Sequence, residues 1–428
     1  MRVLLVGSGG REHALAWALR RSPRLKELFA LPGSDAIAAL ARPVAGDPLD
    51  AEGVAGTCRE LSVDLVVVGP EAPLAAGLGD ALRARGIPVF GPGRAAARLE
   101  SSKTFAKSFM ERHGIPTARS ASFGDPARAR EASSRFGFPV VMKADGLAAG
   151  KGVRICRDAR EAASAIEDFM TLGRLGDSGR TVVLEEFLHG TETTLMGFCD
   201  GRSFLALPPS SDHKRLLDGD LGPNTGGMGV LAPTPEATPG LLRRAEKEVV
   251  ARVLAGLSAD GLDYRGILYC GLMLTASGPR VLEFNARFGD PETQAVLPLL
   301  TGDLLDLLES SALGDLSGRS VTWKGASACV VLASQGYPDA PVTGRPIEGL
   351  DGVPEDALVF HAGTRRDGSL WKTAGGRVLG VTGLGDSLEQ ARDRAYAAVG
   401  AIRFEGMQYR RDIASRRNAA TAAEETRP

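Results

Sequence analysis

The sequence has few features of secreted, membrane-spanning or nucleic-acid-binding proteins. Its five cysteines are scattered and odd in number, with no Cys-x-x-Cys pair, so we expect reduced thiols and a cytoplasmic location. No run reaches the roughly 20 apolar residues of a membrane helix, and the N-terminal apolar run is too short for a signal peptide. The net charge of −1 offers no general attraction to nucleic acid or to an anionic membrane. We therefore expect neither as a partner.

Histidine is also scarce, with five residues in the chain. His213 has no second histidine at metal-ligand spacing, so we interpret it as a positioning residue rather than a ligand or a base. Glycine is plentiful at 54 of 428 residues, which indicates many tight turns and close approaches of the backbone. A chain of this length allows roughly two to four domains.

Three regions follow from the order of the apolar and amphipathic segments. Strands alternate with helices over residues 1–100, which predicts a doubly wound, Rossmann-like α/β domain. Residues 101–320 mix helices with antiparallel strands, and AAARLESSKTFAKSFMERHG predicts a helical segment that ends at Gly114. Residues 321–428 predict a smaller mixed β/α domain whose tail frays from about residue 413. The expected fold class is α/β and α+β multidomain.

A glycine-rich turn follows the first strand, in VLLVGSGGREH. Backbone N–H groups at such a turn, at the positive end of a helix, suit a phosphate. Gly7 and Gly9 fit the start of a dinucleotide fingerprint, but Glu12 stands where its third glycine would be. The next strand also lacks a final acid for a ribose, which argues against an NAD-dependent oxidoreductase. A phosphate site and a purely structural turn both remain open.

A second glycine loop follows an apolar strand, in VVMKADGLAAGKGV. The spacing from Gly146 to Gly150 is one residue too short for a Walker A loop, so this is not a P-loop protein. Lys143 and the loop glycines can still close over a triphosphate through ammonium and backbone N–H contacts. An ordinary flexible hairpin is the alternative.

Two further stretches carry polar residues suited to small ligands. In VVLEEFLHGTETTL, the backbone of Glu185–Leu188 can bind an adenine edge and Glu192 can accept ribose hydroxyls. Solvated surface acids would show the same pattern. In SSDHKRLLDGDLGPNTGGMGV, charged residues precede a glycine-rich turn, which suits a loop around a small anionic substrate.

The stretch RVLEFNARFGDPETQ interrupts an apolar strand with polar residues. Alternation along a strand places Glu283, Asn285 and Arg287 on one face. The other face should hold Leu282, Phe284 and Ala286. Two oxygen donors beside a guanidinium suit a hard cation such as Mg²⁺ with a phosphate, because a charge buried without a partner is costly. A solvated ion pair is the alternative.

The order of these motifs resembles the ATP-grasp ligases, and more narrowly the glycinamide ribonucleotide synthetase family. The resemblance covers essentially the whole chain, through GSGGREHALAW, VGPEAPLAAG, KADGLAAGKGV, DHKR, GPNTGGMG, FNARFGDPETQ, FHAGT and GGRVLGVT. The chain departs from the usual family pattern at Ser8, Ser211 and Ala286. The two serines lie beside expected substrate loops, whereas Ala286 belongs to the apolar face.

The resemblance implies an ATP-grasp domain over residues 101–320, with a lid subdomain at about 117–190. It implies an ATP-dependent ligase of purine biosynthesis that joins glycine to 5-phosphoribosylamine through glycyl phosphate, giving glycinamide ribonucleotide, ADP and phosphate. We expect Mg²⁺ or Mn²⁺ as cofactor, ATP as co-substrate, small molecules as the partners, and a monomer. The alternatives are another purine-pathway ATP-grasp ligase, such as a carboxylase-like or formate-using enzyme, and an inactive nucleotide-binding regulator.

The resemblance also implies roles for individual residues. Arg287 and Lys143 are the expected catalytic residues, and Glu283 and Asn285 the expected metal ligands. The expected ATP-binding residues are Lys103, Lys143, Gly146, Gly150, Lys151, Gly152, Glu185, Glu186, Phe187, Leu188 and Glu192. The expected substrate-binding residues are Gly9, Gly10, Arg11, Glu12, Glu71, Asp212, Lys214, Arg215, Asn224, Thr225, Gly226, Gly227, Arg287, Asp290, Pro291, Glu292 and Thr293.

Overall fold

The computed structural model describes residues 1–148 and 151–415, so Gly150 lies outside the described residues. The N-terminal region is a parallel sheet with strand order β3-β2-β1-β4-β5. Residues 3–6 of its first strand are all apolar because their side chains alternate between two cores, one containing Leu15 of α1 and the other Val54 of α2. The elements are β1 (Arg2–Gly7), α1 (Gly10–Leu19), β2 (Glu27–Pro32), β3 (Arg42–Pro43), α2 (Ala51–Glu60), β4 (Leu65–Val68), α3 (Glu71–Ala76), α4 (Leu78–Arg83) and β5 (Val89–Phe90).

The helical segment that ends at Gly114 consists of two helices, α5 (Arg94–Ser101) and α6 (Lys103–Arg112). The chain is extended at Ser102, with φ −142° and ψ 108°, and the Ser102 hydroxyl accepts a hydrogen bond of 3.2 Å from the N–H of Phe105. Serine competes with the helical backbone in this way, which makes it a good N-cap and a poor interior residue. Lys103 therefore stands at the start of a helix.

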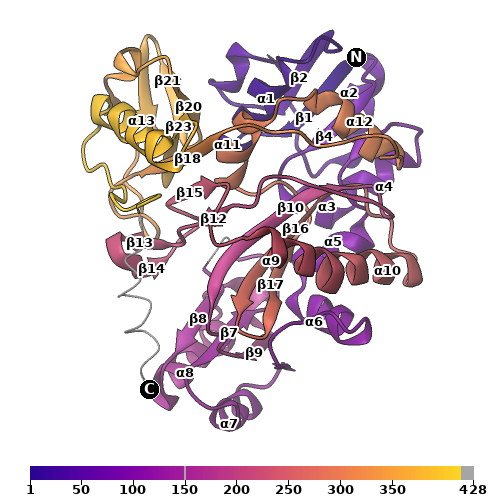
Figure 1. Ribbon diagram of the computed structural model, residues 1–428, viewed down its shortest axis with the longest axis vertical. Helices are drawn as coiled ribbons and strands as arrows, with labels where there is room; N and C mark the ends of the chain where they lie inside the picture. Colours follow the sequence, from indigo (N-terminus) through magenta and orange to yellow (C-terminus); the bar gives the residue numbers. More distant parts are fainter. Residues whose placement is uncertain (149–150, 416–428) are drawn as a thin grey trace.

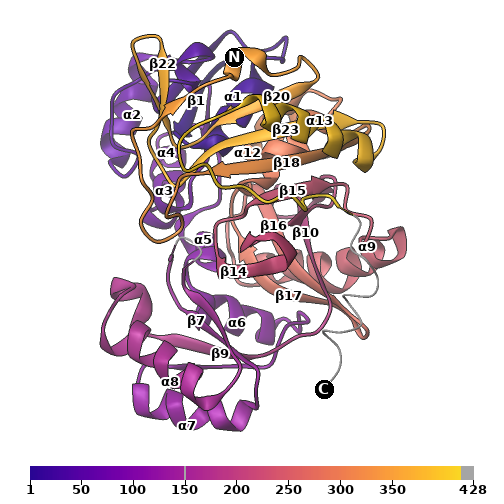
Figure 2. The same ribbon diagram turned by 90° about the vertical axis from the view of Figure 1, so that its left-hand side faces the viewer.

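A separate sheet, which we call the lid, lies at the lower end of the molecule (Figures 1 and 2). Its strand order is β6-β9-β7-β8, and α7 and α8 pack on it around a core of its own. The predicted hairpin around the second glycine loop is confirmed, since β7 and β8 pair antiparallel. The elements are β6 (Ser120–Phe123), α7 (Pro126–Phe136), β7 (Val140–Ala144), β8 (Val153–Cys156), α8 (Ala159–Ile166) and β9 (Val182–Glu186).

The body of the central region is an antiparallel sheet with strand order β11-β10-β16-β17. Helix α10 packs against it through Val253 and Leu257, in a core shared with Phe109 of α6. Figure 1 shows this sheet between the lid and the N-terminal sheet. The elements are β10 (Thr191–Cys199), β11 (Phe204–Ala206), α9 (Pro239–Ala245), α10 (Ala251–Ala259), β16 (Gly266–Thr275), β17 (Gly278–Asn285), α11 (Glu292–Val296) and α12 (Leu304–Leu313).

The C-terminal sheet has the order β12-β15-β18-β23-β20, so two strands from residues 211–232 join it. A small sheet, β19-β22-β21, and a β13–β14 hairpin lie beside it. The elements are β12 (Ser211–Asp212), β13 (Arg215–Leu217), β14 (Leu221–Asn224), β15 (Gly229–Ala232), β18 (Ala326–Ala333), β19 (Pro346–Ile347), β20 (Ala357–His361), β21 (Thr364–Asp367), β22 (Leu370–Thr373), β23 (Arg377–Gly385) and α13 (Leu388–Ala401).

The last described residues pack against the C-terminal sheet. Ile413 is fully buried in the C-terminal core, and its N–H donates a 3.0 Å hydrogen bond to the hydroxyl of Tyr396. Packing therefore fixes the chain at Ile413, and residues 416–428 lie outside the described part, so the frayed tail from about residue 413 stays a prediction. The predicted α/β and α+β multidomain fold class is confirmed. Within residues 1–148 and 151–415, no helix combines the length and apolar character needed to cross a bilayer.

Candidate active site

The polar triplet consists of Glu283, Asn285 and Arg287, at and just beyond the end of β17. This strand contains a β-bulge. Glu283 pairs with Gly271 of β16 and Val281 pairs with Leu272, so Leu282 has no residue opposite it. The apolar face is therefore made by Val281 together with Phe284 and Ala286, and all three are buried. The expectation that Leu282 belongs to this face is wrong, because the bulge inserts it as an extra residue and leaves it half-buried.

Glu283 faces a group of lysines from three separate segments. The ammonium group of Lys214 lies 3.5 Å from a Glu283 carboxylate oxygen. The pKa of Glu283 is lowered to about 2, chiefly by Lys214 and also by Lys143 and Lys103, against the opposing effect of burial. The carboxylate is thus ionised at neutral pH. Its neighbour on the same face, Asn285, accepts a 3.3 Å hydrogen bond from Arg287.

Two of these lysines come from the lid hairpin and from the start of α6. The ammonium group of Lys143 donates a 2.8 Å hydrogen bond to the carbonyl oxygen of Leu282, the residue at the bulge. Lys103 donates to the carbonyl oxygen of Gly146 at 3.4 Å. Burial lowers the pKa of Lys103, Glu283 raises it, and Lys143 lowers it again, with a net decrease. The site therefore holds closely spaced positive charges, and a bound anion would reduce the repulsion between them.

The predicted nucleotide edge lies beside another buried charge cluster. Glu185 is almost fully buried between the ammonium groups of Lys107 and Lys143, each 3.0 Å from one of its oxygens. Glu186 accepts a 2.9 Å hydrogen bond from the N–H of Arg119. Strand β9 ends at Glu186, so the next two predicted residues, Phe187 and Leu188, lie beyond the ladder.

The remaining residues of the ATP-binding prediction lie around this cluster. Glu192 is exposed at the start of β10, and one of its oxygens lies 3.4 Å from the ammonium group of Lys214. Lys151 is exposed on the glycine loop, whereas Gly152 is buried. A Cβ atom at Gly152 would lie 2.8 Å from that of Ala148, so the loop requires a glycine there.

In the N-terminal turn, the predicted substrate residue Glu12 is used internally. One carboxylate oxygen accepts a 2.7 Å hydrogen bond from the N–H of Gly9, and the other accepts one from Arg11 at 2.5 Å. A Cβ atom at Gly7 would lie 2.6 Å from Cγ of Glu12. The structure thus explains the glycine at position 7 and the glutamate at position 12: the glutamate side chain closes the turn that a dinucleotide site would leave open.

The N-terminal turn reaches the triplet through a chain of ion pairs. Glu71, at the start of α3, lies 4.0 Å from Arg11 and 3.4 Å from Arg287. Arg287 also lies 2.8 Å from Glu100 of α5. Burial lowers the pKa of Arg287, but Glu100 and Glu71 raise it by more. The contact with Glu71 is made by the buried Nε of Arg287, which reaches the carboxylate as an ion pair rather than as a well-aligned hydrogen bond.

The loop at 212–227 folds against the turn at 290–293. Burial raises the pKa of Asp212, and neighbouring Glu292 raises it further. Its Oδ1 atom is buried without a hydrogen-bond partner among the described residues. Thr225 bonds to the carbonyl oxygen of Lys214 at 2.9 Å and accepts from the N–H of Gly227 at 3.0 Å.

The other predicted residues of these two segments have structural contacts as well. Arg215 and Asn224 are paired across the β13–β14 hairpin. Glu292 accepts a 2.7 Å hydrogen bond from the hydroxyl of Tyr269, and Thr293 bonds to the carbonyl oxygen of Gly289. Gly10 and Pro291, two further predicted residues, lie at the border of these two segments. A Cβ atom at Gly10 would lie 2.7 Å from the side chain of Gln294, and a Cβ atom at Gly227 would lie 2.6 Å from Pro291.

Sequence reasoning missed Arg377, which joins the two segments. Its guanidinium bonds to the carbonyl oxygen of Gly226, to that of Asp290 at 2.8 Å, and to the Asp290 carboxylate at 3.3 Å. It lies in GGRVLGVT, a stretch that carries the resemblance but contains no predicted site residue. Glu100, Lys107 and Gln294 were also missed. Their sequence contexts gave no signal except for Lys107, four residues after Lys103 on the same helix face.

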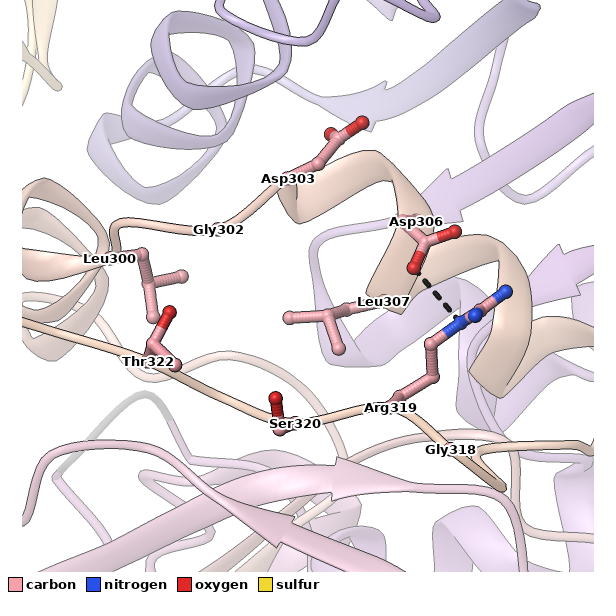
Figure 3. Close-up of a pocket in the computed structure, with 9 residues that line it drawn as sticks. All are labelled: Leu300, Gly302, Asp303, Asp306, Leu307, Gly318, Arg319, Ser320 and Thr322. Carbon is pink, nitrogen blue, oxygen red and sulfur yellow. Dashed lines mark ion pairs between the residues drawn. The ribbon is translucent and has the colours of Figure 1, made fainter.

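A small cavity of about 210 Å³ lies away from these residues, at the start of α12 (Figure 3). Asp306 on its wall pairs with Arg319 at 2.9 Å and with Arg24 at 2.9 Å. Asp303 accepts hydrogen bonds of 2.9 Å from Ser22 and from the N–H of Leu305. Because its charged groups are neutralised within the chain, we assign this cavity no role.

Three segments of the chain match domains of phosphoribosylglycinamide synthetase. Residues 1–100 match its N domain, residues 101–293 its ATP-grasp (A) domain and residues 327–416 its C domain. A phosphoribosylamine–glycine ligase of Ralstonia nicotianae is 50% identical over 420 residues, which are 97% of this chain and 99% of that protein. One of Caulobacter vibrioides is 48% identical over 418 residues, 96% of this chain and 97% of that protein.

Solved structures show the same relationship. A phosphoribosylamine–glycine ligase from Thermotoga maritima superposes with a TM-score of 0.85 at 37% identity, covering 96% of this chain and 100% of that one. The biotin carboxylase domain of a 2-oxoglutarate carboxylase from Hydrogenobacter thermophilus gives a TM-score of 0.71 at 19% identity, covering 95% and 91%. The second similarity shows the fold alone.

Proposed function

The chain belongs to the phosphoribosylglycinamide synthetase family, and from that premise we propose how its residues join glycine to 5-phosphoribosylamine. The enzyme is an ATP-dependent ligase of purine biosynthesis. The glycine carboxylate attacks the γ-phosphorus of ATP, giving glycyl phosphate and ADP. The amine nitrogen then attacks the glycyl carbonyl carbon, and phosphate leaves as glycinamide ribonucleotide forms.

The convergence of Lys103, Lys143 and Lys214 on Glu283 is the observation that carries this proposal. In the first step an anionic carboxylate approaches an anionic triphosphate, so the site must supply fixed positive charge where the charges meet. Three lysines held around one ionised carboxylate provide that charge without reorganisation. Lys103 and Lys143 contact the phosphates, and the loop at 146–152 covers them.

The metal ligands are Glu283 and Asn285, and their chemistry fits a hard divalent cation. Glu283 remains ionised and Asn285 offers an amide oxygen, both typical donors for Mg²⁺ or Mn²⁺. No group of three or more His, Cys, Asp or Glu side chains among the described residues is placed to hold a metal ion. Two protein ligands suit an ion that takes its remaining ligands from nucleotide phosphates and water. When bound, it neutralises charge on the phosphate oxygens.

Arg287 is the second catalytic residue of the proposal. Glu71 and Glu100 fix its guanidinium, at 3.4 Å and 2.8 Å. A guanidinium fork suits the planar carboxylate of glycine and the transferring phosphoryl group. Arg287 therefore orients the two reacting groups.

The substrate pockets lie on either side of this centre. The N-terminal turn at 9–12 with Glu71 holds the phosphoribosylamine, and Glu12 supports the turn. The segments 212–227 and 290–293 hold glycine and the reacting amine. Asp212, buried with one oxygen unpaired, is suited to accept a hydrogen bond from an amino group.

The nucleotide edge completes the site. The backbone of Glu185–Leu188 binds the adenine, and Glu192 accepts the ribose hydroxyls. The protein acts as a monomer in this proposal, with Mg²⁺ or Mn²⁺ as the working ion. The decisive experiment measures ADP release with ATP and Mg²⁺, in the presence and absence of glycine and freshly prepared phosphoribosylamine. Release that requires both substrates supports the ligase, whereas release that is independent of glycine contradicts it.

A further inference from the structure

A second cavity, of about 700 Å³, follows the free edge of β8. One wall belongs to the lid and consists of β8, α8 and the π-helical turn at Glu167–Thr171. The facing wall consists of residues from the β13–β14 hairpin together with Pro338 and Asp339. The cavity thus lies between the lid and the body, and its size suits a small organic ligand.

The walls of this cavity carry an excess of positive charge. Two of its carboxylates are already paired, since Asp168 lies 2.6 Å from Arg154 and 3.1 Å from Arg174, and Glu161 lies 3.9 Å from Arg157. The third is Asp339. Six cationic side chains line the walls: Lys151, Arg154, Arg157, Arg160, Arg174 and Arg215.

Three of the cations have no carboxylate partner among the described residues. Lys151 and Arg160 make no ion pair there, and Arg215 donates to the carbonyl oxygen of Gly222 at 2.8 Å. Positive charges on the walls of one cavity repel each other, and a bound anion offsets that repulsion. Arginine in particular presents a planar fork that matches phosphate oxygens.

Most of this charge lies on the opposite side of the lid sheet from the reaction centre. Val153 pairs directly with Lys143, so these two side chains share a face of the sheet. Arg154 and Cys156 project from the other face, and Cys156 packs in the lid core with Ala162 of α8. The cationic group therefore extends around the edge of β8, away from the lysines that contact the phosphates of ATP in the proposed mechanism.

We propose that this cavity binds a nucleotide, in addition to the ATP that is consumed. The phosphate is held by Arg157 and Arg160 of the lid together with Arg215 of the hairpin. Apolar wall residues, among them Phe169 and Pro338, cover the ring system. Because its two walls belong to the lid and to the body, the bound nucleotide connects them and favours the lid arrangement described here.

The test is a calorimetric titration of the full chain with AMP and, separately, with ADP, while a non-hydrolysable ATP analogue saturates the reaction site. Binding of AMP at one per chain identifies a separate nucleotide as the ligand. Binding of ADP alone identifies the product of the reaction. Either result supports the proposal, and absence of binding by both overturns it, as does one-for-one displacement of the analogue.

Charge-removing variants locate the site. We expect the double variant Arg157→Gln/Arg160→Gln to weaken binding by at least about tenfold, since each lost charge-assisted contact is worth about that factor. The control, Arg128→Gln/Arg130→Gln, removes the same charge from exposed positions on α7 and should bind as the wild type does. Equal affinity in the first variant, or equal loss in the control, overturns the assignment.

Two further measurements make the result independent of folding and of the proposed function. Ser164→Trp obstructs the cavity without changing its charge, and it should abolish AMP or ADP binding if the first variant is unstable. Glycine-dependent ADP release should remain within about twofold in all of these variants, because none of the changed residues contacts the reacting groups. Loss of that release in the wild type would refute the ligase mechanism while leaving this titration interpretable.

Discussion

Lys214 and Glu283 are joined by an ion pair of 3.5 Å at the centre of the site, and Glu192 holds the same ammonium group from the other side at 3.4 Å. The lysine comes from the 212–227 loop and Glu283 from β17, so the pair connects the proposed substrate loop to the proposed metal ligand. It is also the largest cause of the decrease in the pKa of Glu283. Any change at Glu283 should therefore affect metal and substrate together.

We expect Glu283→Gln to fold normally and to lose turnover on the order of 100-fold, because a neutral amide neutralises neither the metal ion nor Lys214. Raising Mg²⁺ or Mn²⁺ should recover part of the activity, since a weaker ligand can still be saturated. The measurement is the rate of ADP release against metal concentration. Glu246→Gln, an exposed change on the body, is the control. Unchanged turnover in Glu283→Gln would remove Glu283 from the metal site.

Arg287→Lys should lose turnover on the order of 10- to 100-fold while ATP affinity is nearly kept. Its guanidinium contacts Glu100 and Asn285 through Nη2 and Glu71 through Nε, and one ammonium group cannot reproduce that geometry. Steady-state kinetics with ATP and glycine varied separately would separate the two effects. A variant that weakens ATP binding at unchanged turnover would make Arg287 a nucleotide anchor instead.

The local patterns were predictable from the sequence because they depend on near neighbours. The apolar strand near the N-terminus had to be buried on both faces, and its side chains do alternate between two cores. The carboxylate of the polar triplet, Glu283, needed a positively charged partner, and Lys214 is that partner. The glutamate that breaks the dinucleotide fingerprint, Glu12, proved to close its own turn.

The remaining features depend on contacts between distant segments, which no local pattern specifies. The bulge at Leu282 changes which residue faces the core, and it arises from the pairing with β16. Strand β15 joins the C-terminal sheet through β18, a strand almost a hundred residues away. Arg377 and Glu100 matter through the partners that the fold brings to them, and an isolated arginine or glutamate in a sequence gives no indication of such a partner.

Acid should destabilise the contact between the N-terminal and C-terminal regions. The backbone N–H of His361 donates a 2.8 Å hydrogen bond to the ring nitrogen Nδ1 of His13. Burial and, to a lesser extent, the neighbouring His361 lower the pKa of His13 to about 3, and burial lowers that of His361 to about 4. Because the unfolded histidines titrate near 6.5, the unfolded state binds more protons below that pH. Stability is fully present above pH 6.5 and decreases as the pH falls toward 4.

The free energy of unfolding should fall by up to about 1.4 kcal/mol per pH unit for each of the two histidines. Urea unfolding between pH 7.5 and 4.5 measures the slope. His13→Gln keeps a hydrogen-bond acceptor but does not titrate, so its slope should be smaller by about one proton. His189→Gln changes an exposed histidine and should keep the wild-type slope. Identical slopes in His13→Gln and the wild type would show that another group controls the acid response.

Arg377→Gln should act on substrate binding rather than on the lysine cluster. The arginine fastens the 225–227 turn to Asp290 through one carbonyl contact on Gly226 and two contacts on Asp290. A glutamine side chain is too short and uncharged to keep all three, so both proposed glycine-binding segments lose a shared support. We expect the KM for glycine to rise about tenfold, while the KM for ATP changes little.

The matched control is Arg392→Gln, because within the described part of the chain Arg392 bonds only to the neighbouring Asp393 of α13. It removes the same charge from the same region and should leave both KM values unchanged. Arg377→Lys offers a second comparison: a single ammonium group can keep the ion pair to Asp290 but not all three contacts, so its glycine KM should lie between those of wild type and Arg377→Gln. If the KM for ATP rose instead, the turn would serve the nucleotide, and the assignment of glycine to these segments would be wrong.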